Sequence, residues 1–160
     1  MTRIRYLTDT SVFARLTKPA VVAAFAPLAA SRQVALSRPV VFELGYAARS
    51  PHDYREVAER LTSFPLVPTT DADHQRALEV QAQLAARSNH RALSLVDALV
   101  AATAEAHDLT VLHYDADFEL VAEGNRSRTP RGRPPRDPWI HLQACFGLLR
   151  SCPLPPPTVP

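Results

Sequence analysis

Short apolar runs alternate with stretches of helical periodicity along the first three quarters of the chain. The runs have the length of buried strands and lie at 4–8, 33–37, 64–68 and 109–114. Apolar residues recur at helical spacing in the stretches 12–16, 19–31 and 53–64, and again after Ser37, Thr70 and Ser94. Strands that alternate with helices in this way predict an α/β fold around a parallel sheet.

Local signals place the helix starts and the faces that the helices bury. Ser37 is expected to cap a helix that has Pro39 in its first turn, where the missing N–H of proline does no harm. Thr69 or Thr70 starts a longer helix. The expected inward residues are Val57, Leu61 and Phe64 in 53–64, and Ala77, Leu78, Leu84 and Ala85 in the longer helix. The last helix presents small residues that let it lie close to the sheet: Ala98, Ala101, Ala102 and Ala104.

Composition divides the chain near residue 123. Its 160 residues suit one domain, and 46% of them are hydrophobic, as expected for an ordinary globular core. Residues 124–160 hold six arginines, one aspartate and nine of the 15 prolines, whereas 1–123 hold 12 basic and 15 acidic residues. A segment of this composition buries too little apolar surface to order itself. We therefore predict a mildly acidic domain at 1–123 and an irregular Arg/Pro-rich extension at 124–160.

Two interpretations of the extension stay open. Its arginines would bind RNA, because phosphate contacts dominate nucleic-acid affinity, or the extension has no function. Cys145 and Cys152 both lie in it, so no disulfide framework or zinc spacing is present. The longest apolar run, 20–30, has 11 residues, fewer than the about 20 that span a bilayer. With no leader pattern at the N-terminus, a cytoplasmic protein is expected.

Four aspartates lie where a strand ends or a helix begins. Asp9 follows the first strand, Asp97 is the fourth residue of a capping box that starts at Ser94, and Asp115 and Asp117 follow the last strand. Each of them has a structural explanation when taken singly, because aspartate caps helices well and suits a polar first turn. For Asp9 and Asp97 considered alone, capping is the favoured interpretation.

Glu43 is the most informative residue of the first half. Its helical neighbours at three and four positions are apolar: Pro39, Val40, Tyr46 and Ala47. A carboxylate on an apolar face is costly unless it is paired or bound to a metal, and no lysine or arginine lies at helical spacing from it. This pattern favours a functional role over a solvated surface position.

Together, the acids are harder to explain as independent caps. Parallel strands direct their carboxyl ends to one edge of a sheet, where ligands bind, and Asp9 and Asp115 both follow such ends. Carboxylates gathered there would repel one another and raise each other's pKa. Lys18 is the chain's single lysine, so a hard divalent cation such as Mg²⁺ or Mn²⁺ is the expected counter-charge. Such a site activates water and neutralises phosphodiester charge.

The same residues, in this order, resemble a known family. Asp9-Thr10-Ser11 after an N-terminal strand, Glu43 on a helix, Asp97 opening VDALVAATA and the segment YDADF at 114–118 are similar to PIN-domain nucleases. More narrowly they resemble the VapC-type toxins of bacterial toxin–antitoxin pairs, over about residues 3–123. Each piece is weak alone, and the set is specific through its order and spacing.

The resemblance implies a fold, an activity and a set of site residues. The fold would be a three-layer PIN-like arrangement, with a mainly parallel sheet of four or five strands flanked by helices. The activity would be Mg²⁺- or Mn²⁺-dependent endoribonuclease cleavage of cellular RNA, in a homodimer that a small antitoxin inhibits. Asp9, Glu43, Asp97 and Asp115 would be the catalytic and metal-binding quartet, with Asp117 as an accessory acid and Ser11 as a hydroxyl that helps hold the metal or its water.

Rival interpretations predict different residues. A phosphoaspartyl protein would need a lysine late in the chain, and the sequence has none there. A non-catalytic interaction module on a PIN-like scaffold would not need all four acids. A PIN nuclease outside any toxin–antitoxin pair would keep the same site and lack the antitoxin partner.

Overall fold

A sheet of four parallel strands lies at the centre of the protein. The computed structural model describes residues 3–86, 88, 91 and 93–114. Within them the strands run in the spatial order β3-β2-β1-β4, all neighbours being parallel. Their bounds are β1 Tyr6–Thr8, β2 Val34–Ser37, β3 Leu66–Val67 and β4 Thr110–Leu112. The first strand is central, because Tyr6 pairs with Val34 on one side and with Thr110 on the other. The predicted parallel α/β sheet is confirmed.

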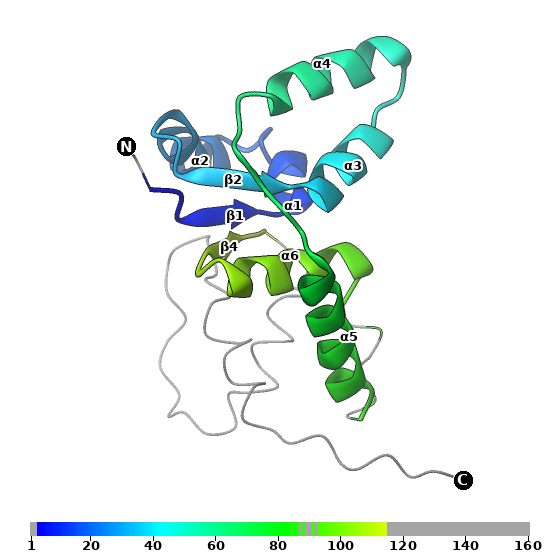
Figure 1. Ribbon diagram of the computed structural model, residues 1–160. Helices are drawn as coiled ribbons and strands as arrows, with labels where there is room; N and C mark the ends of the chain where they lie inside the picture. The colour runs from blue at the N-terminus through cyan, green and yellow to red at the C-terminus, as the bar shows by residue number, and fades with distance from the viewer. Residues whose placement is uncertain (1–2, 87, 89–90, 92, 115–160) are drawn as a thin grey trace, which may run out of the picture.

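Helices cover both faces of this sheet. They are α1 Thr10–Ala14, α2 Pro19–Ala30, α3 Arg38–Tyr46, α4 Pro51–Leu61, α5 Asp71–Ala85 and α6 Leu95–Ala106. Figure 1 shows α2 and α6 on opposite sides of the strands. The helix α3 follows the carboxyl end of β2 and contacts α1, α4 and α6. The order of layers is the three-layer arrangement that the resemblance implies.

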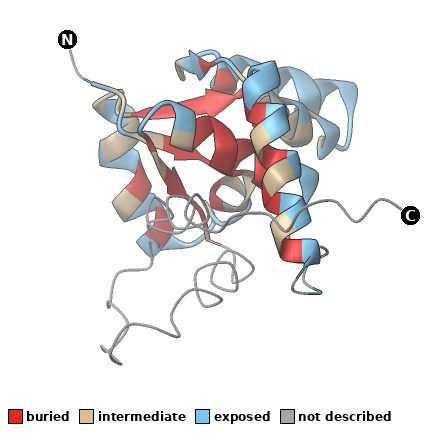
Figure 2. Cartoon of the chain, turned by 60° about the horizontal axis from the view of Figure 1, so that its bottom comes forward, coloured by how far each residue is buried: buried red, intermediate tan, exposed pale blue. Residues whose placement is uncertain are grey.

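Two hydrophobic clusters, one on each face of the sheet, hold the helices against the strands. Along β4 the side chains alternate: Val111 joins the cluster under α5 and α6, and Leu112 joins the cluster with Val21 and Phe25 of α2. Figure 2 shows the buried residues concentrated on the strands and on the helix packed against them. The four alanines of α6 that were predicted to face the sheet are all buried. As predicted, Ala101 and Ala104 let this helix lie close against β1 and β4, whereas Ala98 and Ala102 pack in a separate cluster with Ala77 of α5.

The connections from α6 into β4 and from α2 into β2 use the same turn. At the end of α6, Leu109 N–H donates to the Ala104 carbonyl at 2.9 Å, and Asp108 adopts a left-handed φ of 53°. At the end of α2, Gln33 N–H donates to the Leu28 carbonyl at 3.0 Å, and Arg32 has a φ of 54°. This pattern satisfies the last helical carbonyls and turns the chain back toward the sheet.

Three local predictions were wrong in detail. Leu78 is 58% exposed and Ala85 is exposed, because the stripe of α5 that faces α6 consists of Asp73, Ala77, Val80 and Leu84. Ser37 stands at the cap position of α3 but makes no capping hydrogen bond, since its side chain is fully buried and Pro39 offers no N–H. The helix expected at 53–64 begins at Pro51, because Ser50 Oγ accepts from Asp53 N–H at 3.1 Å.

Some predictions lie outside the described residues. The helix start expected at Asp115 and the whole extension at 124–160 belong to this group. None of the helices within the described ranges is long and apolar enough to cross a membrane.

Candidate active site

A groove with a volume of about 1010 Å³ opens beside the carboxyl end of β1. Three of the predicted acids line it, and each comes from a different part of the chain: Asp9 from the β1–α1 junction, Glu43 from α3 and Asp97 from the first turn of α6. Ser11 and Ser94 line the same groove. The fold therefore brings together side chains that are up to 88 positions apart in the sequence.

Asp9 is held rigidly and keeps one oxygen free. It caps α1, and its Oδ2 accepts from Ser11 N–H at 3.0 Å. The side chain is 2% exposed, and its other oxygen, Oδ1, has no hydrogen-bond partner within the described residues. A buried carboxylate oxygen without a donor is costly. Such an atom suits a cation, because no salt bridge within the described residues supplies Asp9 with a positive charge.

Asp97 is both a helix cap and a member of the acidic group. Its Oδ2 accepts from Ser94 N–H at 3.2 Å, and its own N–H donates to Ser94 Oγ at 3.1 Å, which completes the predicted capping box. Burial raises the pKa of this carboxyl above its usual value, and the negative charges of Asp9 and Glu43 raise the pKa further, against the lowering effect of the Ser94 bonds. Asp9 and Glu43 are thus close enough to affect Asp97.

Asp73 provides an internal comparison for Asp97. It occupies the same fourth position of a capping box in α5, where its Oδ2 accepts from Thr70 N–H at 2.7 Å. Unlike Asp97, it does not line the groove. The chain therefore contains one aspartate that combines the capping role with a place among acids, and one that caps at a distance from them.

Glu43 lies on a less apolar surface than its helical neighbours suggested. Tyr46 is 84% exposed and Ala47 is exposed, so this face of α3 is not uniformly buried, and Glu43 itself is half-buried. In the described part of the chain no lysine or arginine forms a salt bridge with it. Glu43 lines the groove, and its negative charge there helps to raise the pKa of Asp97.

Ser11 joins the two strand ends that border the site. Its Oγ accepts from Tyr114 N–H at 2.9 Å, and Asp9 N–H donates to the Leu112 carbonyl at 2.9 Å. These bonds fasten the end of β4 to the first turn of α1, one residue before Asp115. Asp115 and Asp117 themselves lie outside the described residues. A direct role of Ser11 toward a metal stays a prediction.

The donor set of the groove fits a hard divalent cation. Its acidic end offers carboxylate oxygens, which Mg²⁺ and Mn²⁺ prefer, and Asp9 Oδ1 is an acceptor without a donor in the described ranges. Within those same ranges, no three Asp, Glu, His or Cys side chains enclose a metal position by themselves. Magnesium sites commonly use one or two carboxylates and complete their coordination with water and substrate phosphate.

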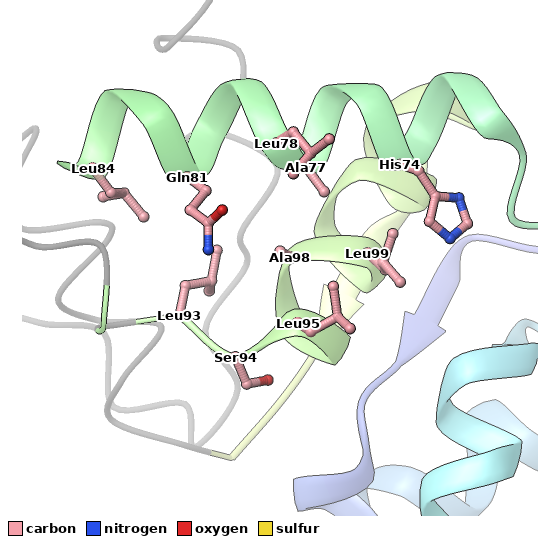
Figure 3. A pocket seen from close by; sticks show the side chains of 10 residues that line it. All are labelled: His74, Ala77, Leu78, Gln81, Leu84, Leu93, Ser94, Leu95, Ala98 and Leu99. Atoms are coloured by element: carbon pink, nitrogen blue, oxygen red, sulfur yellow. The ribbon is translucent and has the colours of Figure 1, made fainter. Parts of the chain in front are cut away.

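The structure adds features that the sequence did not indicate. The groove also has an apolar lining, in which Phe13, Phe25 and Phe64 pack edge to face or tilted at centroid distances of 5.8–6.2 Å. These rings come from three elements, so no local spacing signals them. A smaller pocket of about 190 Å³ lies between α5 and α6 and is lined by residues such as Leu78, Leu95 and Leu99 (Figure 3). It contains no carboxylate and is not a candidate for the metal chemistry.

The raised pKa of Asp97 predicts a pH-dependent stability. The folded state holds the Asp97 proton more tightly than the unfolded chain does, so this contribution to stability is complete below the ordinary carboxyl pKa of 3.8. It is lost as the pH rises through the folded pKa. In a metal-free buffer, Asp97→Asn should therefore raise the melting temperature at pH 7, and the gain should shrink toward pH 4. Thermal unfolding at both pH values measures it, and an equal shift at both would contradict the account.

The comparisons with known proteins show the family of the chain. The family profile described as PIN domain matches residues 6–124. Ribonuclease VapC51 of Mycobacterium tuberculosis is 45% identical over 119 residues, covering 74% of this chain and 86% of the relative. Ribonuclease VapC2 of the same species is 36% identical over 141 residues, covering 84% and 99%. The chain belongs to the PIN domain family, and the phosphoaspartyl alternative is set aside.

Solved structures with a similar fold come from the VapBC group and related complexes. A DNA-bound VapBC complex from Salmonella typhimurium aligns with a TM-score of 0.61 and 17% identity, over 72% of this chain and 91% of that one. FitAcB from Neisseria gonorrhoeae aligns with a TM-score of 0.53 and 26% identity, over 70% and 88%. The protein is therefore a PIN domain that resembles the VapC ribonucleases in sequence and the VapBC group in fold.

Proposed function

We propose that this protein is a metal-dependent endoribonuclease toxin that cleaves cellular RNA and is neutralised by a small cognate antitoxin. The observation that carries the proposal is the gathering of Asp9, Glu43 and Asp97 in one groove. No salt bridge neutralises any of the three within the described residues. The similarity to proteins named ribonucleases supports the reaction class.

Each acid has a defined task in this proposal. Asp9, Glu43 and Asp97, together with Asp115, would hold Mg²⁺ or Mn²⁺. When bound, the ion supplies a water activated for attack and neutralises charge on the phosphodiester. The hydrogen bonds from Ser11 and Ser94 hold Asp9 and Asp97 in place before substrate arrives. Such preorganisation avoids the cost of ordering the ligands during the reaction.

A protein partner is supported by a hydrophobic surface on α3, α4 and β3. Phe42, Tyr46, Tyr54 and Leu66 are between 49% and 84% exposed and border a hollow of about 490 Å³. Exposed aromatic residues gathered in one place are typical of protein interfaces. A solved structure with a similar fold is a toxin–antitoxin complex from Klebsiella pneumoniae, which supports an antitoxin partner for this chain. The same exposed hydrophobic surface is the basis on which we propose a homodimer.

The proposal is tested with the purified full-length chain and a single-stranded RNA. Incubation with Mg²⁺ or Mn²⁺ should shorten the RNA, and the small protein encoded beside the gene should suppress the cleavage. Cleavage without any such neighbouring protein would indicate a PIN nuclease outside a toxin–antitoxin pair. RNA that stays intact with both metals would contradict the enzymatic proposal and favour a non-catalytic interaction module.

A further inference from the structure

Arg15, Lys18 and Tyr114 form a cluster that the site described above does not use. The Arg15 guanidinium carbon lies 5.6 Å from the centre of the Tyr114 ring, and Lys18 Nζ lies 4.7 Å from it. Lys18 Nζ is also 3.5 Å from the Tyr114 hydroxyl. The ring packs against the apolar cluster beneath α1 and α2, so it serves as a platform that positions both cations. Lys18 is the single lysine of the chain.

The cluster lies at the acidic edge of the sheet. Arg15 directly follows α1, the five-residue helix that Asp9 caps. At 1.5 Å per residue, Arg15 is thus about 9 Å from Asp9 along the helix axis. The residues on either side of Arg15, Ala14 and Leu16, both line the groove. Tyr114 is tied to the same helix by its N–H bond to Ser11.

Both cations are exposed and lack a carboxylate partner in the described part of the chain. Two positive charges held on one ring repel each other, and an anion bound between them relieves that repulsion. Two other arginines are paired: Arg76 with Glu79 and Glu105, and Arg3 with Asp108. The cluster is therefore a positive site placed next to an acidic one, in a domain whose acids outnumber its bases.

We propose that Arg15 and Lys18, held on the Tyr114 ring, bind a backbone phosphate of the RNA next to the bond that is cut. This inference rests on the proposed ribonuclease function. An acidic groove repels the polyanion that it must receive, and cations at its border hold the strand while the metal acts on the neighbouring phosphate. The contact positions the substrate and carries no base specificity.

Equilibrium binding of RNA separates this role from a purely structural one. The probe is a short fluorescein-labelled single-stranded RNA of mixed sequence, and the background is full-length Asp97→Asn, so that no cleavage interferes. Adding Arg15→Ala and Lys18→Ala should weaken binding about tenfold or more. Affinity should also depend less steeply on salt: the negative slope of log affinity against log salt should shrink in magnitude by about 0.7 for each RNA phosphate that the variant no longer neutralises. Fluorescence anisotropy across a salt series measures both quantities.

A matched control removes the same charge elsewhere. Arg5 and Arg55 are exposed like the cluster, and Arg5 also lies over a tyrosine ring at 6.0 Å. Unlike Arg15, neither of them is flanked in the sequence by residues that line the groove. The double variant Arg5→Ala, Arg55→Ala should leave affinity and salt slope nearly unchanged. Equal losses in both double variants would show a general charge effect and overturn the inference.

The remaining outcomes distinguish this inference from the proposed function. RNA cleavage by the wild-type chain, with affinity and salt slope unaffected by removal of the cluster, would overturn the inference and leave the function standing. Binding through the cluster without cleavage by the wild-type chain would contradict the function and leave the phosphate contact standing. Unchanged RNA binding with weakened binding of the antitoxin would overturn the inference and assign the cluster to a protein interface.

Discussion

Replacing Asp97 with asparagine is expected to lower the rate of RNA cleavage by more than about 100-fold while the fold stays intact. Groups that merely orient a metal ligand cost about 10–100-fold in activity when they are replaced, so loss of a ligand should exceed that range. Asparagine keeps an oxygen that accepts the Ser94 N–H, so the capping box survives. Initial cleavage rates at saturating Mg²⁺, together with circular dichroism of the variant, measure the two effects.

Asp73→Asn is the control that this chain provides. It makes the same chemical change at the same position of a second capping box, away from the groove. Cleavage should fall by less than about twofold in this variant, because no groove residue is altered. If both variants lose activity alike, or if Asp97→Asn stays fully active, Asp97 acts as a cap and not as a ligand.

Removal of divalent cations is expected to have an effect of similar size. In excess EDTA, cleavage should fall by more than about 100-fold, because the acidic groove then lacks the charge that neutralises the phosphodiester and activates water. Mn²⁺ added beyond the chelator should restore the rate, since Mn²⁺ accepts the same oxygen ligands. Undiminished cleavage in EDTA would contradict a metal-dependent mechanism.

The sheet and its helices were predictable because local chemistry and global fold agree. The apolar run before Asp9 predicted the strand β1. The S-x-x-D box at Ser94 predicted the start of α6, which begins at Leu95. Those signals arise within a few residues, from strand length and capping chemistry. The inward face of α5 was missed in part, since whether Leu78 or Val80 faces inward depends on where α6 packs, and Val80 is the one buried with residues of α6.

The site was predictable only as a set of acids. Asp9 and Asp97 each do cap a helix, as their local interpretation predicted, and their shared groove appears once three distant elements are brought together. Glu43 was singled out for a buried apolar face, yet it is half-buried, because the apolar residues around it include an exposed tyrosine. No sequence spacing relates Lys18 to Tyr114, since their contact depends on how α1 and β4 meet. The roles of Asp115 and Asp117 stay predictions.

The central claim is that Asp9, Glu43 and Asp97 act as a metal site, and a direct titration tests it. Isothermal titration of Mn²⁺ into the metal-free chain should show saturable binding in the wild type and in Asp73→Asn. Binding should be weakened by more than about tenfold in Asp97→Asn. Equal binding by all three proteins, or no binding by the wild type, would contradict the account.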